Sequence, residues 1–207
     1  EGLYRSGELE RAQEYYAGLL DADPETAATA YRRLYTIAQR EGDLQEMERL
    51  LNRAEERLIG RPLLLEEFWL RMGMESHHRG ELELAAHFLR KVAERRGPGG
   101  SPPQVPLYLS EIAASRGDYQ EAVGILQAYL RERDEGGRDV PGLVLFQLGD
   151  LHLRRGEYRR AADRFGEFLQ TGPDPAMTHR AHYSAAFAEH RLGNQEHALE
   201  HLDRALA

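Results

Sequence analysis

Hydrophobic positions along the chain fall into pairs of segments that meet at a glycine. Six such glycines are separated by 35, 38, 37, 39 and 37 residues, and each is followed by Glu, Asp or Asn: Gly7, Gly42, Gly80, Gly117, Gly156 and Gly193. A glycine can close a helix in the left-handed conformation, and an acidic or amide side chain can cap the helix that follows. The pattern therefore predicts a series of helix–turn–helix units along the whole chain.

The residues after each glycine share one helical face. Offsets of two, five, nine and twelve residues lie on the same side of a helix with 3.6 residues per turn. At offset five the side chain is small in every unit except the one with Met47: Ala12, Ala85, Ala122, Ala161 and Ala198. At offset nine it is large: Tyr16, Leu51, Leu89, Leu126, Phe165 and Leu202. A small residue permits a close helix crossing, and the large residue fills the space beside it.

The residues before each glycine predict the partner helix. Its inward positions lie eleven, eight, seven and four residues back, and the position seven back is small at Gly73, Ser110, Gly149 and Ala186. Tyr35 breaks this rule, so we expect a wider crossing there. Trp69 and His152 also occupy inward positions. We therefore interpret both as packed core residues rather than functional ones.

This arrangement resembles the tetratricopeptide repeat family, whose pattern has Trp, Leu-Gly and Tyr on the first helix, Ala-x3-Phe on the second and then Pro. The matching features are Trp69-x2-Met72-Gly73, Leu145-x2-Leu148-Gly149, Ala161-x3-Phe165, Ala12-x3-Tyr16 and the prolines Pro24 and Pro173. The resemblance implies an all-α, right-handed superhelical solenoid of antiparallel helix pairs in a bacterial protein. A closed helical bundle is the alternative architecture.

We expect a single array over residues 1–207, with five full repeats after a leading half repeat. The expected units are 1–24 (the half), 25–61, 62–99, 103–136, 141–173 and 175–207. Neither end of the sequence shows the polar cap that a solenoid usually needs. Two expectations follow: the chain is a segment of a longer array, or a terminal face mediates self-association.

Composition excludes several classes of protein. The formal net charge of −8 argues against general affinity for nucleic acid or for an anionic membrane. No stretch approaches the roughly 20 apolar residues that a membrane-spanning helix needs. The absence of cysteine excludes disulfides, thiolate chemistry and Cys-based zinc sites. A chain without cysteine suits the bacterial periplasm or envelope as well as the cytoplasm, so the compartment stays open.

Residues with catalytic potential form no recognisable constellation. The chain has neither a phosphate-binding loop nor a nucleophile elbow, so we predict neither enzyme activity nor a cofactor. Histidine is enriched near the C-terminus, where His197 and His201 lie four residues apart on one predicted helix. That spacing can hold a metal ion, but a solvated surface pair is the favoured interpretation, and we predict no metal site.

The resemblance also implies where a partner binds. In the family, the first helices of successive pairs line a concave groove that holds peptides, at positions thirteen, ten, six, three and two before the turn glycine. The candidates for partner binding are Arg32, Arg40, Leu70, Met74, His77, Leu107, Phe146, Asp150, Arg154, Tyr183, Phe187 and Arg191. The same transfer includes Thr29, Thr36, Gln39, Glu67, His78, Gln104, Glu111, Ala114, Ser115, Leu143, Leu153, Arg180 and His190.

Several of these candidates are large and apolar, which is unusual on the outer face of a helix and indicates an interaction surface. The alternative is that they pack against one another in a tight superhelix. Over all groove positions, five arginines stand against three carboxylates, which predicts a protein or peptide partner with some negative charge.

The leading functional hypothesis is a non-catalytic scaffold for protein–protein contact, within a bacterial envelope or secretion complex. The alternative is a regulatory or substrate-recruiting arm of a larger enzyme. RNA-binding helical repeats are a third class, but these need polar, basic groove positions. The apolar Leu and Phe residues of the groove disfavour that class.

Overall fold

The computed structural model describes residues 8–206, and every regular element within that range is helical. The elements are α2 (Leu9–Ala17), α3 (Pro24–Glu41), α4 (Leu44–Leu58), α5 (Pro62–His78), α6 (Leu82–Arg96), the short 3₁₀ helix η1 (Pro98–Gly100), α7 (Gln104–Ser115), α8 (Tyr119–Glu135), α9 (Gly142–Arg154), α10 (Tyr158–Gln170), α11 (Pro175–Arg191) and α12 (Gln195–Leu206). The predicted all-α class of tetratricopeptide-like helix pairs is confirmed. The expectations for residues 1–6 and for Gly7 lie outside the described range.

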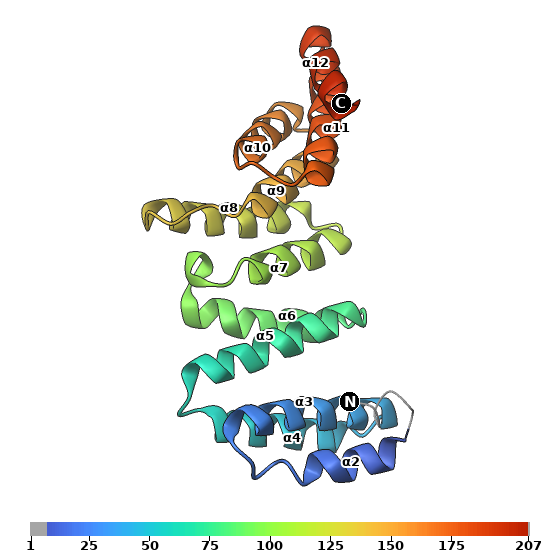
Figure 1. The fold of residues 1–207 in the computed structure, drawn as a ribbon, viewed down its shortest axis with the longest axis vertical. Helices are drawn as coiled ribbons and strands as arrows, with labels where there is room; N and C mark the ends of the chain where they lie inside the picture. The colour runs from blue at the N-terminus through green and yellow to red at the C-terminus, as the bar shows by residue number, and fades with distance from the viewer. Residues whose placement is uncertain (1–7, 207) are drawn as a thin grey trace. The chain divides into compact units, whose positions relative to one another are not determined.

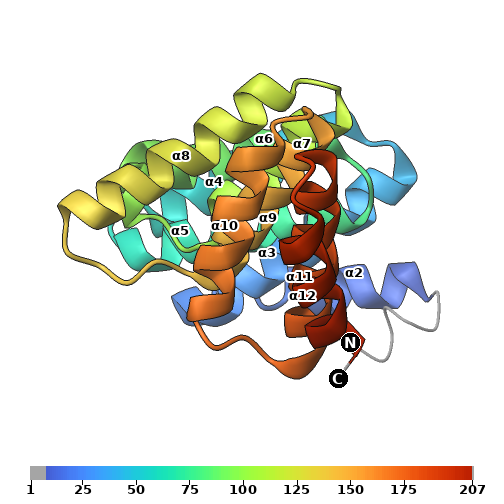
Figure 2. The ribbon, with the colours of Figure 1, turned by 90° about the horizontal axis from the view of Figure 1, so that it is seen from above.

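The helices form two compact units, which we call unit 1 and unit 2. Unit 1 comprises the described chain up to Lys91, and unit 2 begins at Val92, within α6. In unit 2, α7 packs on α8, α9 on α10 and α11 on α12, while α8 contacts α9 and α10 contacts α11. The antiparallel pair of α11 and α12 lies side by side in both views (Figure 1, Figure 2). The single array over the whole chain stays a prediction.

Each described turn glycine adopts the left-handed conformation that the sequence predicts. The φ angles lie between 73° and 83°, at Gly42, Gly80, Gly117, Gly156 and Gly193. The residue after each glycine donates its N–H to the carbonyl five residues earlier, as Glu157 N does to His152 O at 2.9 Å. The glycine N–H donates to the carbonyl three residues earlier. Five turns therefore share the Schellman cap, which satisfies the last carbonyls of the first helix.

The acidic residue after the glycine has two different roles. Asp43 and Asp118 cap the next helix, each accepting a backbone N–H from three residues later at 3.0 Å. Glu157 makes no such cap. Its Oε2 lies 2.6 Å from Nδ1 of His152, in the preceding helix. The predicted caps are therefore confirmed at the two aspartates, whereas Glu157 joins the two helices across the turn.

The helix crossings depend on a small residue that faces a large one. A Cβ added to Gly149 would lie 2.8 Å from Cε1 of Phe165, and one added to Gly73 would lie 2.7 Å from Cγ of Leu89. The small position seven before the turn glycine therefore meets the large position nine after it. This contact brings the backbone of the first helix against the side chain of the second, as the sequence pattern predicts.

Trp69 is a packed core residue of unit 1, as its inward position in the sequence pattern predicts. Its ring is largely buried, and Nε1–H donates to Oε1 of Glu55 at 2.9 Å. Lys91, the only lysine of the chain, forms an ion pair with Glu55 and places Nζ 5.2 Å from the ring centroid of Trp69. A cation over an indole ring is attracted by its negative face. Trp69 thus joins side chains from α4, α5 and α6.

We predict that Gly149→Ala destabilises unit 2 by about 1–3 kcal/mol, because the added methyl group would overlap the buried ring of Phe165. Gly166→Ala is the matched control, since a Cβ at this α10 position meets nothing within 4 Å. It should be neutral or stabilising by up to about 1 kcal/mol. Urea denaturation followed by circular dichroism measures both variants, and equal stability of the two would contradict the close crossing.

We predict that Trp69→Ala destabilises unit 1 by ~3–5 kcal/mol, because it removes a large buried ring. Trp69→Phe keeps most of the packing and loses the hydrogen bond to Glu55, so it should cost only about 1–2 kcal/mol. Denaturation followed by far-ultraviolet circular dichroism compares the two. An alanine variant as stable as the parent would refute the structural role of Trp69.

Candidate functional site

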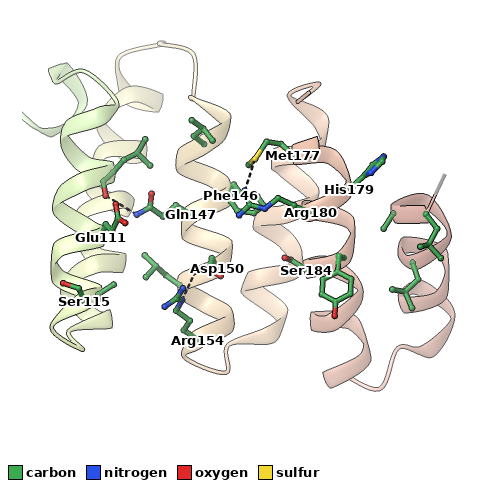
Figure 3. Close-up of a pocket in the computed structure, with 18 residues that line it drawn as sticks. Glu111, Ser115, Phe146, Gln147, Asp150, Arg154, Met177, His179, Arg180 and Ser184 are labelled. Atoms are coloured by element: carbon green, nitrogen blue, oxygen red, sulfur yellow. Dashed lines mark hydrogen bonds and ion pairs between the residues drawn. The ribbon is translucent and has the colours of Figure 1, made fainter. Parts of the chain in front are cut away.

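Unit 2 contains a hollow of about 1020 Å³, which we call the unit 2 hollow. It opens between α7, α9 and α11, and α12 lies beyond α11 (Figure 3). The lining residues are Leu107, Glu111, Ala114, Ser115, Leu143, Phe146, Gln147, Asp150, Leu151, Arg154, Met177, His179, Arg180, Tyr183, Ser184, Leu202, Ala205 and Leu206. First helices of three successive pairs therefore supply most of this surface.

The structure brings five of the predicted partner-binding residues together in this hollow: Leu107, Phe146, Asp150, Arg154 and Tyr183. Five further positions from the same transfer also line it: Glu111, Ala114, Ser115, Leu143 and Arg180. Their convergence follows from the regular stacking of α7, α9 and α11, which places equivalent helical positions side by side. Their role in partner binding stays a prediction.

The apolar part of the hollow combines a fixed floor with two accessible side chains. The ring of Phe146 packs edge-to-face against Phe165 and Phe168, with centroids 5.5 and 5.3 Å away. Tyr183 is 65% exposed and Leu143 is 55% exposed. Large apolar side chains at this level of exposure around a concave surface are typical of an interaction site.

The charged groups of the hollow differ in their pairing. Asp150 accepts a hydrogen bond from Nε of Arg154 at 2.7 Å, and this bond raises the pKa of the Arg154 guanidinium. The guanidinium of Arg180 lies 5.1 Å from the ring centroid of Phe146. Within residues 8–206, Arg180 has no carboxylate partner; its Nη1 contacts Sδ of Met177 at 3.5 Å. It therefore offers a cation stacked on an aromatic floor.

The whole hollow is close to electrically balanced. Its lining contains two arginines, Arg154 and Arg180, and two carboxylates, Glu111 and Asp150. The excess of positive charge counted along the predicted groove therefore does not extend to this surface. Any preference for an acidic ligand must come from Arg180, because Arg154 is already neutralised by Asp150.

A half-buried amide, that of Gln147, joins α7 and α9 at the wall of the hollow. Nε2 of Gln147 donates to the carbonyl oxygen of Leu107 at 3.1 Å and to Oγ of Ser110 at 2.8 Å (Figure 3 shows Gln147 directed toward α7). These bonds hold the two helices at a set spacing. The hollow is thus largely preformed, as ligand sites usually are.

Two predicted residues of α11 lie outside the hollow. Phe187 is 44% exposed and packs edge-to-face against Tyr158, with centroids 6.3 Å apart. The guanidinium of Arg191 lies 4.6 Å from the ring centroid of Tyr158. Phe187 and Arg191 therefore form a cluster with the second helix α10.

Arg32 requires a correction, because the transfer from the family pattern expected it on an accessible surface. It is only 6% exposed, and its guanidinium pairs with the carboxylate of Glu75 on α5. Burial lowers the pKa of Arg32, and the charge of Glu75 opposes that shift. Arg32 is a buried link between α3 and α5, so we remove it from the candidate surface.

The other unit 1 candidates are Arg40, Leu70, Met74 and His77, and none of them lines the unit 2 hollow. Leu70, Met74 and His77 are half-buried, whereas Arg40 is exposed. The ring of His77 packs edge-to-face against His78, with centroids 6.1 Å apart. A role for these four residues in partner binding stays a prediction.

Sequence reasoning missed the contribution of α12 to the hollow. Leu202 and Ala205 occupy the offsets that predict packing positions, yet both are only half-buried and line the hollow with Leu206. Met177 and His179 were also missed, because they precede the first groove position of α11. The available signal was the presence of Leu202 and Leu206 in the last predicted helix.

The histidine pair near the C-terminus is not the pair that the i,i+4 spacing on one helix indicates. His201 faces His182 of α11 rather than His197, with the two Nδ1 atoms 2.9 Å apart. Burial and the mutual charge effect lower the pKa of His182, and burial lowers that of His201. Within the described part of the chain, no three His, Asp or Glu side chains gather in a metal-binding arrangement.

His152 is the core residue that its inward position predicts. Its side chain is 1% exposed and bonds only to Glu157 among the described residues. Burial lowers the pKa of His152, although Glu157 opposes the shift. Burial alone would raise the pKa of Glu157, but the bond to His152 and the nearby arginines bring it below its usual value.

Comparison with known proteins agrees with this fold. The sequence profile of the tetratricopeptide repeat family matches residues 146–207, which include α10, α11 and α12. The comparison with curated protein sequences found no match. None of the helices in the described range is long and apolar enough to cross a membrane.

Solved structures resemble the chain over most of its length. BtubC from P. vanneervenii is 21% identical with a TM-score of 0.66, covering 99% of this chain and 90% of its own. MamA from Desulfovibrio magneticus is 17% identical with a TM-score of 0.59, covering 89% and 94%. PilF of Pseudomonas aeruginosa is 17% identical with a TM-score of 0.57, covering 97% and 84%.

Together these observations define a helical-repeat protein with a concave surface on its first helices. The repeats over residues 146–207 are of the tetratricopeptide type by the family profile, and the described chain has the fold of solved tetratricopeptide structures. Helical repeats of this kind present extended surfaces for contact with other proteins.

We predict that the chain loses stability as the pH falls below about 6.5, the ordinary pKa of histidine. The folded state holds His152 neutral with a lowered pKa, so the unfolded state binds protons more readily, and acid favours unfolding. Urea midpoints at about pH 7.5 and about pH 5.5 measure the loss. In His152→Gln the loss should be smaller, and an identical loss would show that His152 does not contribute.

Proposed function

We propose that the chain is a non-catalytic protein-binding module, and that the unit 2 hollow holds a peptide segment of a partner protein. The observation that carries this proposal is the exposure of Tyr183 on α11 and Leu143 on α9, two helices that line a hollow of about 1020 Å³. Ligand sites of this size combine apolar walls with a few directed polar groups. Here the polar groups are Arg180 and the amide of Gln147.

The chemistry of the hollow selects the ligand. An apolar side chain would pack between Tyr183 and Leu143, over the floor that Phe146 provides. A carboxylate close to that side chain in the ligand would meet Arg180, whose guanidinium is already oriented by stacking on Phe146. Arginine is suited to bidentate recognition of a carboxylate. The preferred ligand is therefore a segment with apolar anchors and one nearby Asp or Glu.

The alternative of a recruiting arm for a larger enzyme uses the same surface in the same way. A role in a bacterial envelope or secretion complex is a narrower version of the leading hypothesis. Each of these settings requires the same ligand chemistry at the hollow.

We predict that peptides selected from a random library on the intact chain bind at this hollow. Tyr183→Ala should weaken their binding by about tenfold or more, because a central aromatic anchor commonly contributes over 1 kcal/mol. Phe187→Ala is the matched control: it lies one turn further along the same helix, is also exposed, and does not line the hollow. Fluorescence anisotropy measures both affinities. Equal weakening by the two substitutions would place the binding elsewhere.

We also predict that Arg180 accounts for the salt dependence of binding. Affinity for peptides with a carboxylate should fall between about 0.05 and about 0.5 M NaCl, since salt screens exposed charge pairs. Arg180→Ala should weaken binding and flatten this dependence. Arg131→Ala is the control, because Arg131 is exposed on α8 and does not line the hollow. Salt dependence that survives in Arg180→Ala would contradict the assigned role.

A further inference from the structure

The pair of His182 and His201 connects the two helices that form one side of the unit 2 hollow. Their Nδ1 atoms lie 2.9 Å apart and their ring centroids 5.1 Å apart. Neither ring is part of the hollow lining. Each, however, immediately precedes a residue that is: Tyr183 follows His182, and Leu202 follows His201. The pair therefore lies directly behind the wall of the hollow.

The α11–α12 contact is extensive, but few side chains of α12 are fully buried. Ala198 is the only residue of α12 that is fully buried. At the turn, Nδ2 of Asn194 donates to Oε2 of Glu189 at 2.6 Å. Away from the turn, the histidine pair is the polar contact that attaches α12 to α11. A change at this pair therefore acts on the position of Leu202, Ala205 and Leu206.

Protonation changes the pair in two steps. When both rings are neutral, one Nδ1–H donates to the unprotonated Nδ1 of the other ring. A first proton can be accommodated, because an imidazolium still donates to a neutral partner. A second proton leaves two N–H groups facing each other and two positive charges at close range, so the contact must open.

Most of the surrounding charges also disfavour protonation of the histidine pair in the closed contact. Arg204 of α12 repels a proton from both rings, His179 of α11 repels one from His182, and His197 repels one from His201. Glu189 and Glu200 favour protonation of His201. Burial favours the neutral form of both rings. The α11–α12 contact therefore favours the neutral form of both histidines, and protonation at low pH disfavours that contact.

We propose that the His182–His201 pair makes the unit 2 hollow sensitive to pH, with α12 attached and the hollow formed near neutral pH and α12 released on acidification. The part of this proposal that concerns ligand affinity rests on the proposed function. The part that concerns α12 itself does not. Histidine is the side chain whose protonation falls in this pH range.

The first experiment needs no ligand. Amide hydrogen exchange of the intact chain is measured at about pH 7.5 and about pH 5.5 and corrected for the intrinsic rate at each pH. Protection of α12 should fall by about fivefold or more on acidification, because the released helix binds protons that the paired rings exclude. In His201→Gln the change should be less than about twofold. His197→Gln, at an exposed position of the same helix, should respond nearly like the parent chain, because His197 makes the smallest of the charge contributions at His201. No response in the parent, or an unchanged response in His201→Gln, would overturn the proposal.

A second measurement remains decisive if His201→Gln loses α12 altogether. Nuclear magnetic resonance titration of the imidazoles in the parent chain should show two coupled steps for His182 and His201, both below the ordinary histidine pKa of 6.5. Independent titration of the two rings at that ordinary pKa would overturn the proposal.

Ligand affinity separates this inference from the proposed function. A peptide selected on the hollow should bind about tenfold more weakly at the lower pH to the parent chain, and nearly equally at both values to His201→Gln. If α12 responds to pH but no peptide binds, the proposed function fails and the pH coupling stands. If peptides bind and α12 does not respond, the reverse holds.

Discussion

The architecture depends on the close crossing of two helices within each repeat, where a residue with little or no side chain meets a large one. Gly149 lies against the ring of Phe165, and Gly73 lies against Leu89. Each crossing follows a Schellman turn whose glycine reverses the chain at a fixed distance. Because both constraints repeat in register, equivalent positions on α7, α9 and α11 line up along one surface. The hollow in unit 2 is a consequence of that alignment.

Most of the fold could be predicted from the sequence because its signals are local. The turn glycines, the small and large offsets and the inward position of Trp69 all report on contacts within one helix pair or with its neighbour. Ten of the fifteen groove positions of α7, α9 and α11 lie together in one hollow, since regular stacking determines their positions, and their role in binding stays a prediction. Arg32 departs from this rule because Glu75 of α5 lies close enough to pair with it and bury it.

Other parts of the site depend on long-range geometry that a repeat pattern does not contain. His182 and His201 contact each other across two helices and nineteen residues of sequence, whereas the i,i+4 spacing indicates a pair of His197 and His201. The charge balance of the hollow likewise depends on which arginines have partners. Arg154 is neutralised within its own helix, Arg191 stacks on Tyr158, and Arg180 is the one that faces the hollow without a carboxylate among the described residues.

The contact between Trp69, Glu55 and Lys91 also gives unit 1 its own intrinsic fluorescence probe. Trp69 is the only tryptophan of the chain, and Lys91 is its only side-chain amine. Indole emission therefore reports on unit 1 alone, whereas tyrosines such as Tyr31 and Tyr158 lie in both units. A reagent that acylates lysine would remove the charge beside this one indole, so the state of unit 1 can be followed through a single chemically addressable fluorophore.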